Sequence, residues 1–151
     1  MHALKRTNAQ NQDFLKLITE LDRELAVIDG EEHAFFSQFN TVGDIQHVVL
    51  AYQGGEAIGC GAIKEYSAGK MEVKRMFVAR GQRGRGIASS ILKELENWAQ
   101  ELSYTSCVLE TGIRQPDAIQ LYKKNQYIQT PNYPPYEAVQ SSVCFEKSLP
   151  G

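Results

Sequence analysis

The chain has 151 residues, and its 42% hydrophobic and 23% charged residues exclude a disordered protein and predict a soluble globular one. The formal net charge of −2 argues against nucleic acid or an anionic membrane as a partner, because both attract basic surfaces. No apolar run is long enough to cross a bilayer, and residues 1–11 lack the apolar stretch of a signal peptide, so we expect a cytoplasmic protein. Without an internal repeat or a linker, residues 1–151 are expected to form a single domain.

The first half of the chain predicts a strand, two helices and an antiparallel meander. A short strand is expected over residues 4–7. Apolar residues at three- and four-residue spacing after Asn11 predict a helix that ends at Gly30. A second, short helix over residues 31–39 is expected to turn its three phenylalanines inward. Glycine-containing turns then separate three strands, which are predicted over residues 47–52, 57–65 and 71–78.

A glycine-rich turn, RGQRGRGIA over residues 80–88, follows the third strand and leads into an amphipathic helix. Glycines let the backbone approach an anion closely, and the first turn of a helix points free N–H groups and the positive end of its dipole at it. Arg83 and Arg85 add positive charge. We interpret the segment as a pyrophosphate-binding turn. A flexible surface loop is the plainer alternative, and the missing Gly-Lys-Ser/Thr excludes a Walker A loop.

The second half of the chain predicts alternating strands and helices. A short apolar strand is expected over residues 106–110, and Pro116 stands at a plausible first position of a helix. Further strands are expected from Tyr127 and over residues 142–145, with a proline-rich loop between them. The histidines show no metal-ligand spacing, so no metal site is expected.

Two short motifs then stand at a characteristic separation. A pattern of Arg or Gln, two residues, Gly, one residue, and Gly or Ala is matched by Arg83, Gly86 and Ala88. A second pattern, Ala-x-x-Leu-Tyr, is matched by Ala118, Leu121 and Tyr122. With these motifs and its element order, nearly the whole chain resembles the GNAT superfamily of N-acetyltransferases.

The resemblance implies a fold and a reaction. The fold would be the acyl-CoA N-acyltransferase (GNAT) fold of the α+β class. It has three layers, α/β/α, with a mixed, mostly antiparallel central sheet and flanking helices. The reaction would transfer an acetyl group from the cosubstrate acetyl-CoA to a primary amine of a small molecule, by direct attack in a ternary complex. A protein lysine or N-terminus as acceptor, and a CoA-binding module without catalysis, remain alternatives. A homodimer is one arrangement that the resemblance allows.

The resemblance also implies which residues bind the cofactor. The strand that ends at Val78 would splay from its neighbour and pair with the pantetheine arm, with the Met76 N–H as the oxyanion donor. The implied cofactor-binding residues are Met76, Phe77, Val78, Arg83, Gly84, Arg85, Gly86, Ile87, Ala88, Ser89 and Gln115.

The chain departs from the superfamily pattern at two places. Gln115 stands where many members carry Asn. Gln126 and Tyr127 replace a common Gly-Phe pair, and we expect Asn125 to adopt the left-handed conformation that the glycine would provide.

Catalytic roles follow from the same positions. Tyr122 is the candidate general acid for the leaving thiolate, because a phenol releases its proton only when charge develops on sulfur. Glu72 is the candidate base, since strand alternation would place it on one face with Met76 and Val78; a solvated strand residue is its alternative. Glu110 is the rival base or a substrate ligand, and Tyr136 is a further candidate for substrate binding. An acidic cluster near the end of the first helix would form either a wall of the acceptor site or a solvated face; its members are Asp22, Glu24, Asp29, Glu31 and Glu32.

Overall fold

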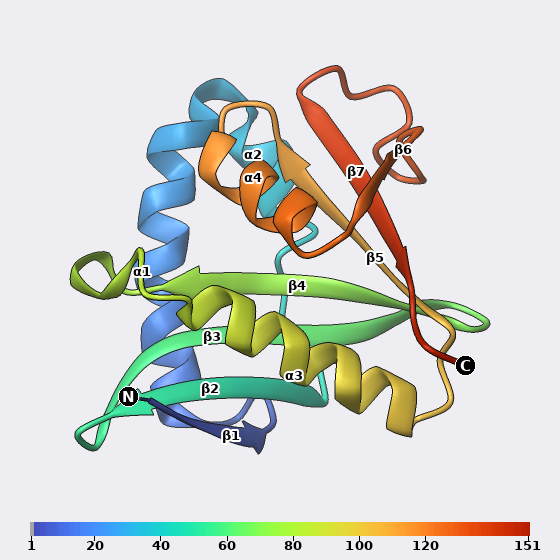
Figure 1. Ribbon diagram of the computed structural model, residues 1–151. Helices are drawn as coiled ribbons and strands as arrows, with labels where there is room; N and C mark the ends of the chain where they lie inside the picture. The colour runs from blue at the N-terminus through green and yellow to red at the C-terminus, as the bar shows by residue number, and fades with distance from the viewer. Residues whose placement is uncertain (1) are drawn as a thin grey trace.

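The computed structural model describes residues 2–151 as three layers around one sheet (Figure 1). The sheet has seven strands in the order β1-β2-β3-β4-β5-β7-β6, and all neighbours pair antiparallel except β4 and β5. The strands are β1 (Ala3–Thr7), β2 (His47–Gln53), β3 (Glu56–Ser67), β4 (Lys70–Val78), β5 (Ser106–Gly112), β6 (Ile128–Thr130) and β7 (Ser142–Ser148). The predicted meander and the mixed, mostly antiparallel sheet are therefore confirmed.

Helices cover both faces of the sheet, as Figure 1 shows, with α3 in front of β2–β4 and α1 behind them. The helical segments are α1 (Gln12–Asp29), η1 (Gly30–Glu32), α2 (His33–Ser37), η2 (Arg80–Gln82), α3 (Ile87–Glu101) and α4 (Pro116–Lys124). Because successive strand residues point to opposite faces, β2 contributes Val48 and Leu50 to the core under α1, and Val49 and Ala51 to the core under α3. The predicted α/β/α layering is confirmed.

Local chemistry sets several of the element boundaries. The side chain of Asn11 accepts hydrogen bonds from the backbone N–H groups of Asp13 and Phe14, which caps α1. Gly30 ends α1 with a φ of 55°, which glycine adopts without steric cost. Pro116 opens α4, as predicted.

Two local predictions are wrong. Phe35 is exposed rather than turned inward, because α2 spans little more than one turn and cannot bury all three phenylalanines against the sheet. Asn125 does not adopt the left-handed conformation after α4. Gln126 does, with a φ of 68°, so the strained position coincides with the place of the superfamily's glycine.

Among residues 2–151, no helix combines the length and the apolar character that crossing a membrane requires. Over the same residues, no group of three or more His, Cys, Asp or Glu side chains is arranged to hold a metal ion.

Candidate active site

Strands β4 and β5 separate soon after they meet. Their parallel pairing covers Lys70 to Glu72 on β4, against Ser106 to Val108 on β5, and then stops. The rest of β4, up to Val78, therefore has no β5 partner on that side and keeps backbone groups available to an extended ligand. The predicted splay is confirmed, and a strand paired along its whole length on both sides is excluded.

A β-bulge at Arg75 changes the alternation of β4. The register against β3 shifts there, and Arg75 has a φ of 57°. Met76 and Val78 consequently pack into the core under α3, in which Met71 and Val73 also lie. Since Glu72 lies between those two residues, it points to the opposite face. The prediction that Glu72 shares a face with Met76 and Val78 is wrong, because strict alternation does not survive an inserted residue.

The splayed end of β4 borders a cleft of about 640 Å³. Ten of the eleven predicted cofactor-binding residues line this cleft: Met76, Phe77, Val78, Arg83, Gly84, Gly86, Ile87, Ala88, Ser89 and Gln115. The exception is Arg85, whose guanidinium donates to the side-chain oxygen of Gln82. Glu24 and Ile28 of α1 and Asp117 and Lys124 of α4 form further parts of the wall.

The glycine-rich turn has the geometry of an anion site. Gly84 and Gly86 have φ values of 79° and 78°, and an added Cβ at either position would meet no atom within 4 Å. Gly86 is the N-cap of α3, and no side chain caps the helix, so the N–H groups of its first turn remain available to a ligand. The residues present therefore fit a phosphate group.

The guanidinium of Arg83 already has hydrogen-bond partners within the protein. Its Nε–H donates to the Val78 carbonyl at 2.8 Å, and Nη2 donates to both carboxylate oxygens of Glu24 at 2.9 and 3.0 Å. Arg83 thus connects the end of β4 to α1. Any contact of this residue with a phosphate is more readily made by its backbone N–H than by its engaged side chain.

A second, smaller cavity of about 140 Å³ adjoins the cleft. The cavity and the cleft share seven lining residues, namely Leu21, Ile28, Met76, Arg114, Gln115, Ala118 and Tyr122. The smaller cavity alone is lined by Glu72, Lys74, Glu110 and Tyr136, among others. Three predicted site residues, Glu72, Glu110 and Tyr136, thus lie together here, and Tyr122 stands where the two spaces meet.

The two carboxylates of the cavity are in different environments. Glu72 accepts a hydrogen bond from the Tyr133 hydroxyl at 2.7 Å, and its other oxygen lies 3.5 Å from the Lys74 ammonium. Glu110 accepts one hydrogen bond, from the Ser142 hydroxyl at 2.8 Å. Burial raises the pKa of Glu110 to about 7, and the Ser142 hydrogen bond opposes that rise. A carboxyl group with this pKa can exchange a proton near neutral pH.

Two phenols also line the cavity with their hydroxyls available. Tyr122 is 6% exposed and Tyr136 is 4% exposed. Neither hydroxyl forms a hydrogen bond with any other group of residues 2–151. Burial, followed by the Glu110 charge, raises the pKa of both phenols, so they are proton donors rather than phenolates at neutral pH. The aromatic ring of Tyr136 packs on Phe39 and Tyr133.

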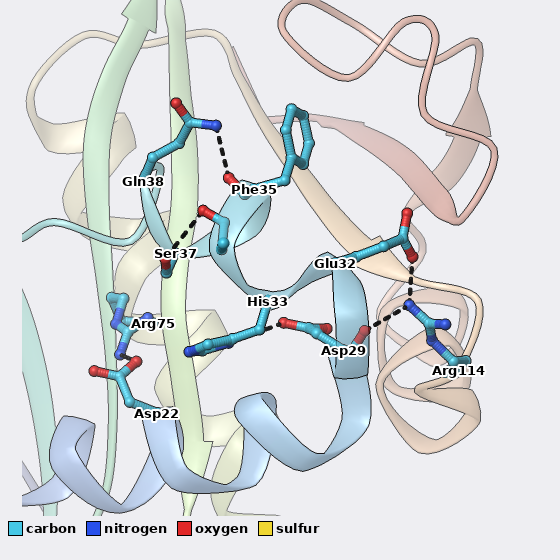
Figure 2. Close-up of polar contacts among 10 residues, drawn as sticks. Asp22, Asp29, Glu32, His33, Phe35, Ser37, Gln38, Arg75 and Arg114 are labelled. Carbon is cyan, nitrogen blue, oxygen red and sulfur yellow. Dashed lines mark hydrogen bonds and ion pairs between the residues drawn. The ribbon is translucent and has the colours of Figure 1, made fainter.

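Figure 2 shows polar contacts at the end of α1, around the cavity-lining residues Asp29 and Arg114. Arg114 donates to the carboxylate of Glu32, which also accepts from the Ser141 hydroxyl at 3.0 Å. The carboxylate of Asp29 lies 3.8 Å from His33 Nδ1. The predicted acidic cluster is therefore neither a free wall nor a fully solvated face. Three of its members pair with arginines, which are Arg75 for Asp22, Arg83 for Glu24 and Arg114 for Glu32.

Sequence reasoning did not place Lys74 in the site, and it missed the apolar residues of α1 that line the cavity. Lys74 could have been found, because it shares a face with Glu72 on the same strand, two residues away. The lining positions Leu21 and Ile28 could not, because their apolar spacing is the same as that of core residues in any amphipathic helix.

Comparison with known proteins agrees with this geometry. Residues 12–127 match the acetyltransferase (GNAT) family. The "IAA acetyltransferase" of Azospirillum brasilense is 35% identical over 149 residues, which cover 97% of each chain. The structure of a Klebsiella pneumoniae protein assigned to the acyl-CoA N-acyltransferases superposes with a TM-score of 0.84. It is 29% identical and covers 99% of this chain and 98% of its own.

A more distant structure shares the fold. A GNAT family acetyltransferase from Elizabethkingia anophelis, solved with acetyl-CoA bound, has a TM-score of 0.73 at 18% identity and covers 98% of both chains. The family match spans most of the chain, and the relative from Azospirillum brasilense matches along almost its entire length. The chain belongs to the acetyltransferase (GNAT) family.

Proposed function

We propose that this protein transfers an acetyl group from acetyl-CoA to the primary amine of a small molecule, by direct attack in a ternary complex. The observation that carries the proposal is the meeting of two spaces at Tyr122 and Met76: a long cleft with an anion-binding turn, and a small cavity with a carboxyl group of pKa about 7. This arrangement brings a thioester and an amine together without a covalent enzyme intermediate.

The cleft holds the cofactor in this proposal. The N–H groups at the start of α3, beside Gly84 and Gly86, take the pyrophosphate. The open edge of β4 pairs with the pantetheine amides, and the Met76 N–H donates to the developing oxyanion. The family membership and a relative solved with acetyl-CoA support this choice of cosubstrate.

Proton transfer completes the proposal. The amine nitrogen forms a bond to the thioester carbonyl carbon, and the carbon–sulfur bond breaks as the tetrahedral intermediate collapses. Glu110 takes the proton that the amine loses, and Tyr122 donates its hydroxyl proton to the leaving thiolate. We assign the base to Glu110 because its carboxyl group titrates near neutrality. Both oxygens of Glu72 are already in contact with Tyr133 and Lys74.

The small cavity favours a small acceptor over a protein. About 140 Å³ is below the volume of a typical drug-sized site, so the cavity leaves little room for a large acceptor.

Two measurements test the proposal. The first is thermal unfolding with and without acetyl-CoA, where binding to the native state raises Tm. The second measurement follows release of the CoA thiol with three kinds of acceptor: a panel of small amines, an unstructured lysine peptide, and the IAA in the name of the Azospirillum brasilense relative. Mass spectrometry confirms the acetylated product. No rise in Tm at millimolar acetyl-CoA would contradict the cofactor assignment. Binding without thiol release for any acceptor would favour a CoA-binding module, and release with the peptide alone would favour a protein substrate.

A further inference from the structure

Some of the hydrogen-bond donors on residues that line the smaller cavity lack a close acceptor. The Lys74 ammonium has three donors, its side chain is 12% exposed, and its contact with Glu72 is long, at 3.5 Å. The Nε–H of Arg75 is buried and has no partner among residues 2–151. The hydroxyl of Tyr136 has none in that range either. Donors that lack a close acceptor favour a ligand that brings acceptor oxygens.

Lys74 and Glu110 stand across the gap between β4 and β5. The parallel pairing ends with Glu72 and Val108, and Lys74 and Glu110 each lie two residues beyond that last pair, on the two strands that border the gap. Both side chains line the same cavity, and the Lys74 charge acts on the titration of Glu110. An ammonium group and a proton-accepting carboxyl group therefore face one small space from opposite sides.

We propose that the acceptor is an amino acid whose carboxylate binds the Lys74 ammonium while its amine is directed at Glu110. A carboxylate is an acceptor-only group, which complements the donors of Lys74 and Tyr136. The amine carries the protons that Glu110 removes. The inference rests on the proposed function and adds to it the substrate class and a specificity-determining residue, Lys74.

The remaining lining limits the amino-acid side chain. The cavity of about 140 Å³ has apolar walls from Leu25 of α1 and Phe36 of α2 and, next to the cofactor cleft, from Leu21 and Ala118. Small or medium apolar side chains fit such walls, whereas a diamine would bring a second ammonium group towards the Lys74 ammonium in place of a carboxylate. Diamines are therefore expected to be poor acceptors.

The experiment compares three versions of each acceptor: the free amino acid, its carboxamide and the decarboxylated amine. For the wild-type protein, kcat/KM for thiol release is expected to be at least about tenfold higher for the amino acid than for either analogue, the size of effect expected for a lost charge-assisted hydrogen bond. The carboxamide has the less basic amine and the decarboxylated amine the more basic one. A preference for the acid over both therefore cannot come from amine basicity.

Variants locate the preference. Lys74→Met is expected to lower kcat/KM for the amino acid, mainly through KM, by at least about tenfold more than it lowers kcat/KM for the carboxamide. Both acceptors are measured well above pH 7, where Glu110 is ionised in both proteins, so that loss of the Lys74 charge does not act through the base. Lys70→Met on the same strand is the matched control, because Lys70 is more exposed, pairs with Glu146 and lies outside the cavity, and it is expected to change neither. Thermal unfolding confirms that each variant is folded. If Lys74→Met does not fold, the wild-type comparison still decides the question.

The inference would be overturned if the wild type had equal kcat/KM values for the amino acid and its carboxamide, or if it preferred diamines. Acetylation of any of these amines would still uphold the proposed function. A preference for the acid that persists in folded Lys74→Met would overturn the role of Lys74. No thiol release with any of these amines or with the wider panel would instead contradict the proposed function, so the two failures are distinguishable.

Discussion

The Ser142 hydroxyl on β7 donates a 2.8 Å hydrogen bond to Oε2 of Glu110 on the neighbouring strand β5. This contact favours the ionised carboxylate, but burial favours the neutral form more strongly, and the pKa of Glu110 rises to about 7. The balance between one hydrogen bond and desolvation therefore sets the protonation state of the proposed base.

The first prediction concerns the pH dependence of turnover. If Glu110 is the base, kcat is expected to rise with pH through an inflection near 7, because only the ionised carboxylate accepts a proton. In Glu110→Gln, this inflection is expected to disappear, and kcat is expected to fall by about a hundredfold or more. Ser142→Ala removes a hydrogen bond to the ionised form, so its inflection is expected to lie at higher pH than that of the wild type. Coinciding kcat profiles for wild type and Glu110→Gln would move the role to Glu72 or to water.

The second prediction concerns stability. Because the folded-state pKa of Glu110 lies above its ordinary value of 4.5, ionisation costs the folded state free energy. That cost is absent below about pH 4.5, grows as the pH rises, and levels off above about 7 at no more than about 3 kcal/mol. Glu110→Gln carries no such cost, so its stability relative to the wild type is expected to increase from pH 5 to pH 8. Urea unfolding of both proteins at the two pH values measures this difference, and a difference that stays constant would contradict the raised pKa.

The third prediction concerns the general acid. Tyr122→Phe removes a hydroxyl that lies at the meeting point of the two spaces and keeps the ring that packs near Tyr127 and Phe145. We expect kcat to fall by at least about tenfold with little change in acetyl-CoA affinity. Tyr127→Phe is the matched control. The Tyr127 hydroxyl donates to buried Glu96, and Tyr127 lines neither the cleft nor the smaller cavity. Removing this hydroxyl is therefore expected to lower the stability of the protein and to leave kcat unchanged. Wild-type turnover in folded Tyr122→Phe would refute the acid role.

The fourth prediction concerns the phosphate turn. Gly86→Val places a branched side chain over the N–H groups that open α3, and we expect it to weaken acetyl-CoA binding by at least about tenfold in a calorimetric titration. The φ of 78° also strains any non-glycine residue there. Gly55→Val is a strain-matched control in the β2–β3 turn, with a φ of 81° and open space around it. Equal affinities of the two variants would place the phosphates elsewhere.

Much of the fold and of the cofactor cleft could be predicted from the sequence, because the signals are local. Alternating apolar residues and glycine turns predict β2, β3 and β4, and three- and four-residue spacing predicts α1 and α3. The turn from Arg83 to Ala88 could be predicted from the sequence because its neighbours in the sequence are also its neighbours in space. The same holds for the order of strand, turn and helix that aims N–H groups at an anion.

The acceptor side of the site depends on contacts between distant segments, and these could not be predicted. The bulge at Arg75 lies opposite Gly61, where an added Cβ would stand 2.5 Å from Met76 Sδ, so it depends on packing between β3, β4 and α3. Because of this bulge, the side chains of Glu72 and Met76 lie on opposite faces of the sheet. The pKa of Glu110 depends on burial by segments far apart in the chain. The sequence by itself thus determined most of the secondary structure and the place of the glycine-rich turn before α3. Only the tertiary structure decided which carboxyl group is desolvated in the cavity, because desolvation depends on everything that surrounds a side chain and not on its neighbours in the sequence.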